Sequence, residues 1–140
     1  MKKICGFYCC ETEVPPILES KLKKKMEYLI RHKDVRRFLV NYRPNDFFLF
    51  VLRSLKELKQ KYRFLAIYLT VNPWHLQHFT DTGLMPDFLP YLNVEDEYPS
   101  YQYWSDWEPN YIIVFDPFDY ETVKDVLLPP LLPLFRSHLP

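Results

Sequence analysis

Two adjacent cysteines, Cys9 and Cys10, follow an apolar run near the N-terminus, where a turn leads into a helical pattern. A thiol at a helix N-terminus can have a lowered pKa and act as a nucleophile. The alternative, small side chains filling a turn beside the core, is favoured because no histidine is near in the sequence. Because all cysteines lie in one short segment, no disulfide framework is expected. We therefore expect the protein in a reducing, cytoplasmic compartment.

A second polar group, Arg43, Asn45 and Asp46, follows the next apolar run. An arginine at the end of a strand can bind phosphate, and the two shorter side chains can contact phosphate or ribose. Asn45 or Asp46 can equally cap the helix that begins near Phe47. Arg43 is therefore the stronger candidate for ligand binding.

His75 and His78 are spaced i, i+3, so they can share one helical face as metal ligands, with Asp81 or Asp87 as a third. Two nitrogens do not make a metal site, and a solvated histidine pair is the commoner explanation. We predict no metal and no cofactor.

Carboxylates also recur at both ends of the chain: Glu11, Glu13, Asp106, Glu108 and Asp116. A pair of them would suit acid and base roles in hydrolysis of a glycosidic bond. Acidic residues at a helix start are also ordinary partners of the helix dipole, so an enzyme is not favoured.

An aromatic cluster can stack a base or contact a protein partner. It comprises Tyr98, Tyr101, Tyr103, Trp104 and Trp107. We expect at least Trp104 to lie in the core.

Short apolar runs alternate with amphipathic helical patterns, which predicts βαβ units and a parallel sheet. The predicted strands are 3–8, 35–41, 63–71 and 110–117. The first predicted helix has Thr12 or Glu13 as its N-cap and Pro15-Pro16 inside its first turn, and the others are 47–62, a short one at 101–107, and 120–128. Some 25 residues after Pro73 are expected to form a long loop with one helical turn, and 131–135 an edge strand or a segment packed across the sheet.

The fold class predicted is therefore α/β: a single Rossmann-like domain over 1–140, with a mainly parallel sheet of four or five strands and helices on both faces. Its core would span 3–128, and 129–140 would be a proline-rich tail.

Charge is divided unevenly along a chain whose formal net charge is zero: residues 1–70 carry 16 Lys+Arg and 7 Asp+Glu, and residues 71–140 carry 2 and 11. The halves are thus +9 and −9, which predicts attraction between the halves or between copies, hence a homo-oligomer. Nucleic acid is not favoured as a partner because no uncompensated basic domain is present, and no membrane segment is expected.

Several local patterns resemble the bacterial SLOG superfamily, the Rossmann-like group that includes DprA/Smf and LOG-type proteins. Its Phe-Phe-Gly-His-Arg-Asp-Thr motif aligns with 6–12, where Phe7 and Thr12 match and Glu11 is conservative. Its second block is similar to FLVNYRPNDFF and the following VLRSLKELKQKY, and its third to Tyr101, Gln102, Tyr103 and Trp104, then Pro109, Asn110 and Tyr111.

This resemblance implies a nucleotide or nucleotide-derived small molecule, bound without catalysis at the carboxyl ends of the strands. The candidate ligand-binding residues are Cys9, Cys10, Glu11, Thr12, Asn41, Arg43, Asn45, Asp46, Tyr101 and Gln102. Because Tyr8, Asn41 and Pro44 replace the glycines of such a pocket, the alternative is a scaffold with a closed pocket that acts through protein contacts. A nucleoside or nucleotide N-glycosidic hydrolase is a weaker alternative.

Overall fold

The computed structural model describes residues 3–9, 14–94, 109–115 and 123–127 of the 140-residue chain. A six-stranded sheet has the order β4-β3-β2-β1-β5-β6. Its strands are β1 (Lys3–Cys9), β2 (Val35–Tyr42), β3 (Ala66–Val71), β4 (Leu92–Val94), β5 (Tyr111–Phe115) and β6 (Val123–Leu127). The first five pair in parallel and β6 runs antiparallel to β5, so the prediction of a mainly parallel α/β domain is confirmed.

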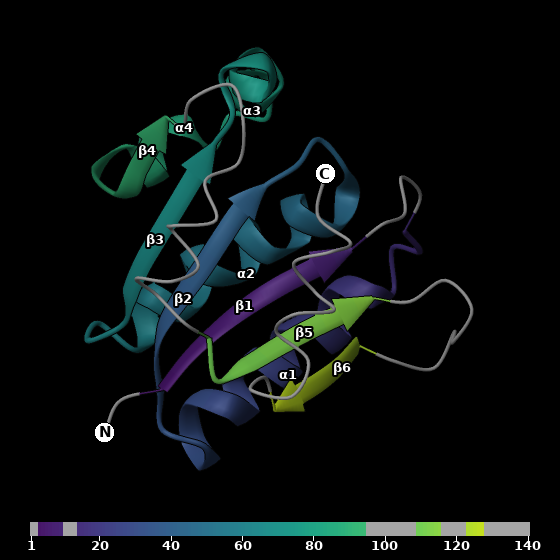
Figure 1. Cartoon of the computed structure of the whole chain (residues 1–140), viewed down its shortest axis with the longest axis vertical. Helices are drawn as coiled ribbons and strands as arrows, with labels where there is room; N and C mark the ends of the chain where they lie inside the picture. The colour runs from purple at the N-terminus through teal and green to yellow at the C-terminus, as the bar shows by residue number, and fades with distance from the viewer. Residues whose placement is uncertain (1–2, 10–13, 95–108, 116–122, 128–140) are drawn as a thin grey trace.

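The two long helices are α1 (Leu18–His32) and α2 (Asp46–Lys61), and both lie on one face of the sheet (Figure 1). Right-handed crossovers explain this, because β1, β2 and β3 are neighbours and both connections step across the sheet in the same direction. The expectation of helices on both faces therefore does not hold for these two helices.

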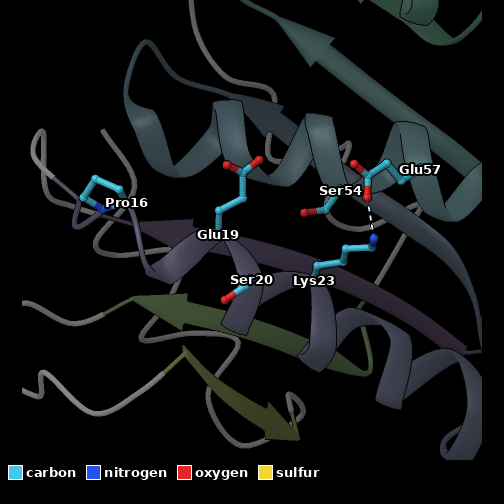
Figure 2. A pocket seen from close by; sticks show the side chains of 6 residues that line it. All are labelled: Pro16, Glu19, Ser20, Lys23, Ser54 and Glu57. Carbon is cyan, nitrogen blue, oxygen red and sulfur yellow. Dashed lines mark hydrogen bonds and ion pairs between the residues drawn. The ribbon is translucent and has the colours of Figure 1, made fainter.

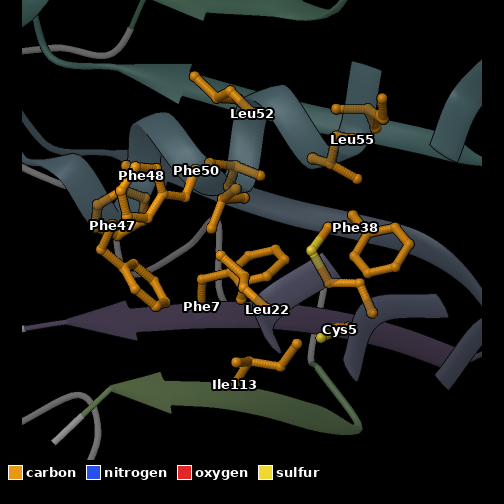
Figure 3. Close-up of a cluster of buried hydrophobic side chains, with 14 of the residues drawn as sticks. Cys5, Phe7, Leu22, Phe38, Phe47, Phe48, Phe50, Leu52, Leu55 and Ile113 are labelled. Carbon is orange, nitrogen blue, oxygen red and sulfur yellow. The ribbon is translucent and has the colours of Figure 1, made fainter. Parts of the chain in front are cut away.

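The core lies between the sheet and these helices. Alternate strand residues such as Phe7, Phe38 and Ile113 point to this face and meet apolar side chains of both helices (Figure 3). Phe47 is fully buried at the start of α2, with its ring centroid 6.5 Å from that of Phe7 and 6.4 Å from that of Phe115. The apolar core thus reaches the carboxyl ends of β1 and β5.

The segment expected to be a loop after Pro73 contains several short elements. They are η1 (Pro73–His75), α3 (Leu76–Asp81), α4 (Met85–Phe88) and η2 (Leu89–Tyr91), followed by β4. Phe79 and Phe88 are buried and anchor this segment to the core. The structure thus has four short helical elements where a loop with one helical turn was expected, because single buried rings, rather than a periodic stripe, hold them.

The helix predicted at 120–128 is also wrong, because 123–127 form β6. A segment of this length does not form a stable helix in isolation. The free edge of β5 instead gives it a strand to pair with. Valines at 123 and 126 also favour a strand. The helix predicted at 101–107 and the edge strand at 131–135 lie outside the described residues.

Three ion pairs with one spacing join α1 to α2: Glu19 with Arg53, Lys23 with Glu57, and Glu27 with Lys61. We call them the interhelix ladder. In each pair the partners are 34 residues apart, as expected for two parallel helices packed in one register. The Arg53 guanidinium donates two hydrogen bonds to the Glu19 carboxylate, both 2.8 Å long.

The ladder predicts a pH-dependent effect of Glu27→Gln. Hydrogen bonds from Lys61 and then Tyr62 hold the pKa of Glu27 below its usual 4.5. A lowered folded-state pKa stabilises the fold above the unfolded-state pKa, and this stabilisation disappears as pH falls through the folded value. Urea unfolding should therefore give the wild type a higher free energy of unfolding than the variant at pH 7. This difference should disappear as the pH is lowered. A gap that persists at low pH contradicts the prediction.

Candidate functional site at the carboxyl ends of β2 and β3

Polar side chains gather where β2 and β3 end, and we call Tyr42, Arg43, His75 and His78 the β2–β3 cluster. Tyr42 is the last residue of β2, and Arg43 follows it. The two histidines come from η1 and α3, which follow β3 directly. In parallel α/β sheets this edge is where ligands bind.

Tyr42 fixes one histidine of the cluster. Its ring is 1% exposed and packs edge-on against Phe79 with 5.2 Å between centroids. The Tyr42 hydroxyl lies 2.6 Å from Nδ1 of His78, a hydrogen-bond distance. Burial raises the pKa of Tyr42 to about 12, so the hydroxyl keeps its proton at neutral pH and can donate to an unprotonated Nδ1.

His75 lies near both Arg43 and His78. Its Nδ1 is buried and has no hydrogen-bond partner among the described residues. Burial, then the charges of Arg43 and His78, hold the pKa of His75 below its usual 6.5. Arg43 and His78 therefore lie close enough to His75 to disfavour a positive charge on its ring.

The start of α2 lies at the same edge. Asn45 is its N-cap, and its side-chain oxygen accepts a 3.1 Å hydrogen bond from the backbone N–H of Phe48. The capping interpretation of Asn45 is thus confirmed, and Asp46 is an exposed residue in the first turn. The partial positive charge of this helix end adds to that of the cluster.

The carboxyl end of β1 is different in character. Cys9 is 4% exposed, and Phe115, Val14 and Phe47 are buried around the same end of the core. A buried thiol among apolar side chains favours the core-filling interpretation over a reactive nucleophile.

Asn41 does not join the cluster, because side chains alternate along β2 and Asn41 points to the face opposite Tyr42. Its side-chain oxygen accepts a 3.1 Å hydrogen bond from the Thr70 hydroxyl on β3.

The candidates Cys10, Glu11, Thr12, Tyr101 and Gln102 lie outside the described residues. So do Glu13, Asp106, Glu108 and Asp116, which were considered for hydrolysis, and the aromatic cluster of 98–107. Within the described ranges, no three His, Cys, Asp or Glu side chains are grouped to hold a metal ion.

Sequence reasoning considered His75 and His78 only as a metal pair and did not select Tyr42. Tyr42 extends the apolar alternation of Phe38 and Val40 by one step, so continuing the strand would have placed it at the end of β2. Its hydrogen bond with His78 joins residues 36 apart in the sequence, which no local pattern indicates.

A separate groove of about 340 Å³ lies between α1 and α2 (Figure 2). Its lining residues are Pro16, Glu19, Ser20, Lys23, Ser54 and Glu57. Ser54 is 2% exposed, and its Oγ has no hydrogen-bond partner within the described part of the chain. Its charged lining residues belong to the interhelix ladder: Glu19 pairs with Arg53, and Lys23 pairs with Glu57.

The electrostatics of the β2–β3 cluster give a direct prediction. Arg43→Ala should raise the pKa of His75, because it removes one of the charges that disfavour the imidazolium. Titration of the histidine ring protons by NMR measures this shift. Arg63→Ala, which removes an exposed charge before β3, should leave the pKa of His75 unchanged; an equal shift in both variants contradicts the assignment.

The same lowered pKa makes the folded state less stable in acid. The unfolded chain binds a proton at His75 more readily than the folded chain, so this group's contribution to stability falls as pH drops below 6.5.

None of the described helices has the length and apolar composition needed to span a membrane. Comparison of the chain with family models, curated proteins and solved structures gives no match.

Proposed function

We propose that this chain binds a nucleotide or nucleotide-derived small molecule at the β2–β3 cluster, without transforming it. The observation that carries the proposal is the convergence of Arg43, His75 and His78 at the carboxyl ends of two parallel strands. The resemblance to SLOG proteins suggests the same edge and the same class of ligand.

The physical argument is electrostatic. The Arg43 guanidinium and the start of α2 meet at this edge beside the two histidine rings, and a phosphate placed there would pair with their positive charge. Arg43 is the principal phosphate contact in this proposal, since its guanidinium can donate two parallel hydrogen bonds. The Nδ1 of His75 is buried without a hydrogen-bond partner among the described residues, and a ligand hydroxyl or phosphate oxygen that reached it would supply one.

A thermal-shift screen against nucleotides, cyclic nucleotides, NAD and ADP-ribose tests the proposal. A ligand at a hundredfold its Kd should add about 2.7 kcal/mol of stability to wild type. Arg43→Ala should lose this stabilisation, Arg43→Lys should keep part of it, and Arg63→Ala should keep all of it. Binding that survives in Arg43→Ala places the ligand elsewhere, and no shift with any compound refutes the proposal.

A protein-binding scaffold is the second candidate function, and the carboxyl end of β1 favours it. There Cys9, Phe47 and Phe115 bury apolar side chains where a phosphate-binding turn needs bare backbone. Failure of every ligand in the screen, with the fold intact by circular dichroism, would favour this scaffold.

A further inference from the structure

The solvent side of α1 divides into two differently charged flanks. The two acidic residues of α1, Glu19 and Glu27, both lie on the flank toward α2, where the interhelix ladder neutralises them. The adjoining face carries Ile17, Lys21, Lys24, Tyr28 and Arg31, and we call it the α1 stripe. Their spacing of 4, 3, 4 and 3 residues places all five on one side of the helix.

The α1 stripe combines positive charge with exposed apolar surface. Ile17 is 68% exposed and Tyr28 is 44% exposed. Among the described residues, Lys21 and Lys24 form no ion pair, while Arg31 lies near enough to Glu27 to lower its pKa. Exposed ion pairs alone associate weakly, and the two apolar side chains add area that a partner can bury.

The rest of the basic first half is less available for a partner. Arg36 pairs with Asp34 at 3.1 Å, and Lys56 pairs with Asp87 at 3.2 Å. Lys59 donates hydrogen bonds to the backbone carbonyls of Arg63 and Leu65. Internal contacts therefore occupy these cations, and the α1 stripe carries the most concentrated remaining positive charge of the described helices.

We propose that the α1 stripe is an interface for a second copy of the chain, which contributes its acidic half. Residues 71–140 carry 11 Asp+Glu against 2 Lys+Arg, so the chain supplies the complementary charge itself. The densest acidic run, Glu95 to Glu97, follows Val94 directly in the sequence.

Within one copy, the sheet topology separates α1 from the end of β4. Val94 ends β4, which is one edge strand, whereas α1 contacts β6, the strand at the opposite edge (Figure 1). The stripe and the end of β4 are different surfaces of one molecule. If each of two copies contributes both surfaces, the interface is isologous and closes as a dimer; if each pair of copies makes one such contact, it is heterologous and closes as a ring.

Sedimentation velocity over a wide concentration range, at low and at high ionic strength, tests this interface. We expect association at low salt that weakens at high salt. Lys21→Glu with Lys24→Glu should raise the dissociation constant by about tenfold or more. The matched control, Lys33→Glu with Arg63→Glu, reverses the same number of exposed charges away from the stripe and should leave association nearly unchanged.

A charge-swap experiment identifies the partner surface. Glu95→Lys with Glu97→Lys should weaken self-association, and mixing this variant with the Lys21→Glu, Lys24→Glu variant should restore it. Lys21→Gln with Lys24→Gln serves as a milder variant if the reversal impairs folding, and it should also weaken association.

A wild-type chain that stays monomeric at low salt overturns the proposal. So does association that salt leaves unchanged, or that the stripe and control variants weaken equally. If the wild type associates and the stripe variant alone weakens it, but the charge swap gives no restoration, the acidic partner is wrong. Ligand binding at the β2–β3 cluster is measured separately, so neither result depends on the other.

Discussion

Phe47→Ala should lower the free energy of unfolding by about 3–5 kcal/mol. The Phe47 side chain is fully buried, and its ring packs against those of Phe7, Phe48 and Phe115. Removing it leaves a cavity where β1, β5 and the start of α2 meet. Folded domains are stable by roughly 5–15 kcal/mol in total, so the variant should unfold at a much lower urea concentration.

Phe64→Ala is the matched control, because it removes the same side chain from a site that is 55% exposed. The Phe64 ring lies 4.5 Å from the guanidinium carbon of Arg36, a cation–π contact of about 0.5–1 kcal/mol at an exposed site. Urea denaturation of both variants compares the two sites. Similar losses of stability would mean that Phe47 does not occupy the core.

Ser54→Ala should stabilise the fold, by about 1–3 kcal/mol if the full cost of an unsatisfied buried hydroxyl is relieved. Ser54 Oγ faces α1 at the interhelix groove (Figure 2), and no described residue forms a hydrogen bond with it. Alanine keeps the small volume that lets α1 and α2 pack closely, and it removes only the polar atom. Thermal or urea unfolding at neutral pH measures the gain.

Ser20→Ala separates this effect from helix propensity. Ser20 lies in α1 and lines the same groove, but it is exposed and its hydroxyl donates a 3.3 Å hydrogen bond to the Ile17 carbonyl. Both substitutions gain the same helix propensity, which is at most about 0.7 kcal/mol, so the difference between them reports the buried hydroxyl. A Ser54→Ala variant no more stable than Ser20→Ala would show that this hydroxyl is satisfied in solution.

The periodic parts of the fold could be predicted from local sequence. Leu18, Leu22, Met26, Leu29 and Ile30 form a helical stripe, and all five are buried in α1. Asn45 caps α2 as its position before an apolar stripe suggested. Helix amphipathicity and capping are local properties, so neighbouring residues specify them without knowledge of the partner surface.

Segments that depend on distant contacts could not be predicted in the same way. The strand β6 forms because β5 offers an open edge, and the short helices after β3 are held by the burial of Phe79 and Phe88. The placement of α1 and α2 on one face follows from the strand order β3-β2-β1, which alternation of strands and helices does not specify.

The sequence by itself determined the α/β class, the parallel βαβ units and the separation of charge between the two halves, because composition and short-range periodicity encode these features. Only the tertiary structure brought Tyr42 and Arg43 to His75 and His78, and only it placed Glu19 and Glu27 on the flank of α1 that faces α2. Both arrangements depend on which strands and helices become neighbours. That choice is made by packing over the whole domain, and no short stretch of the chain contains it.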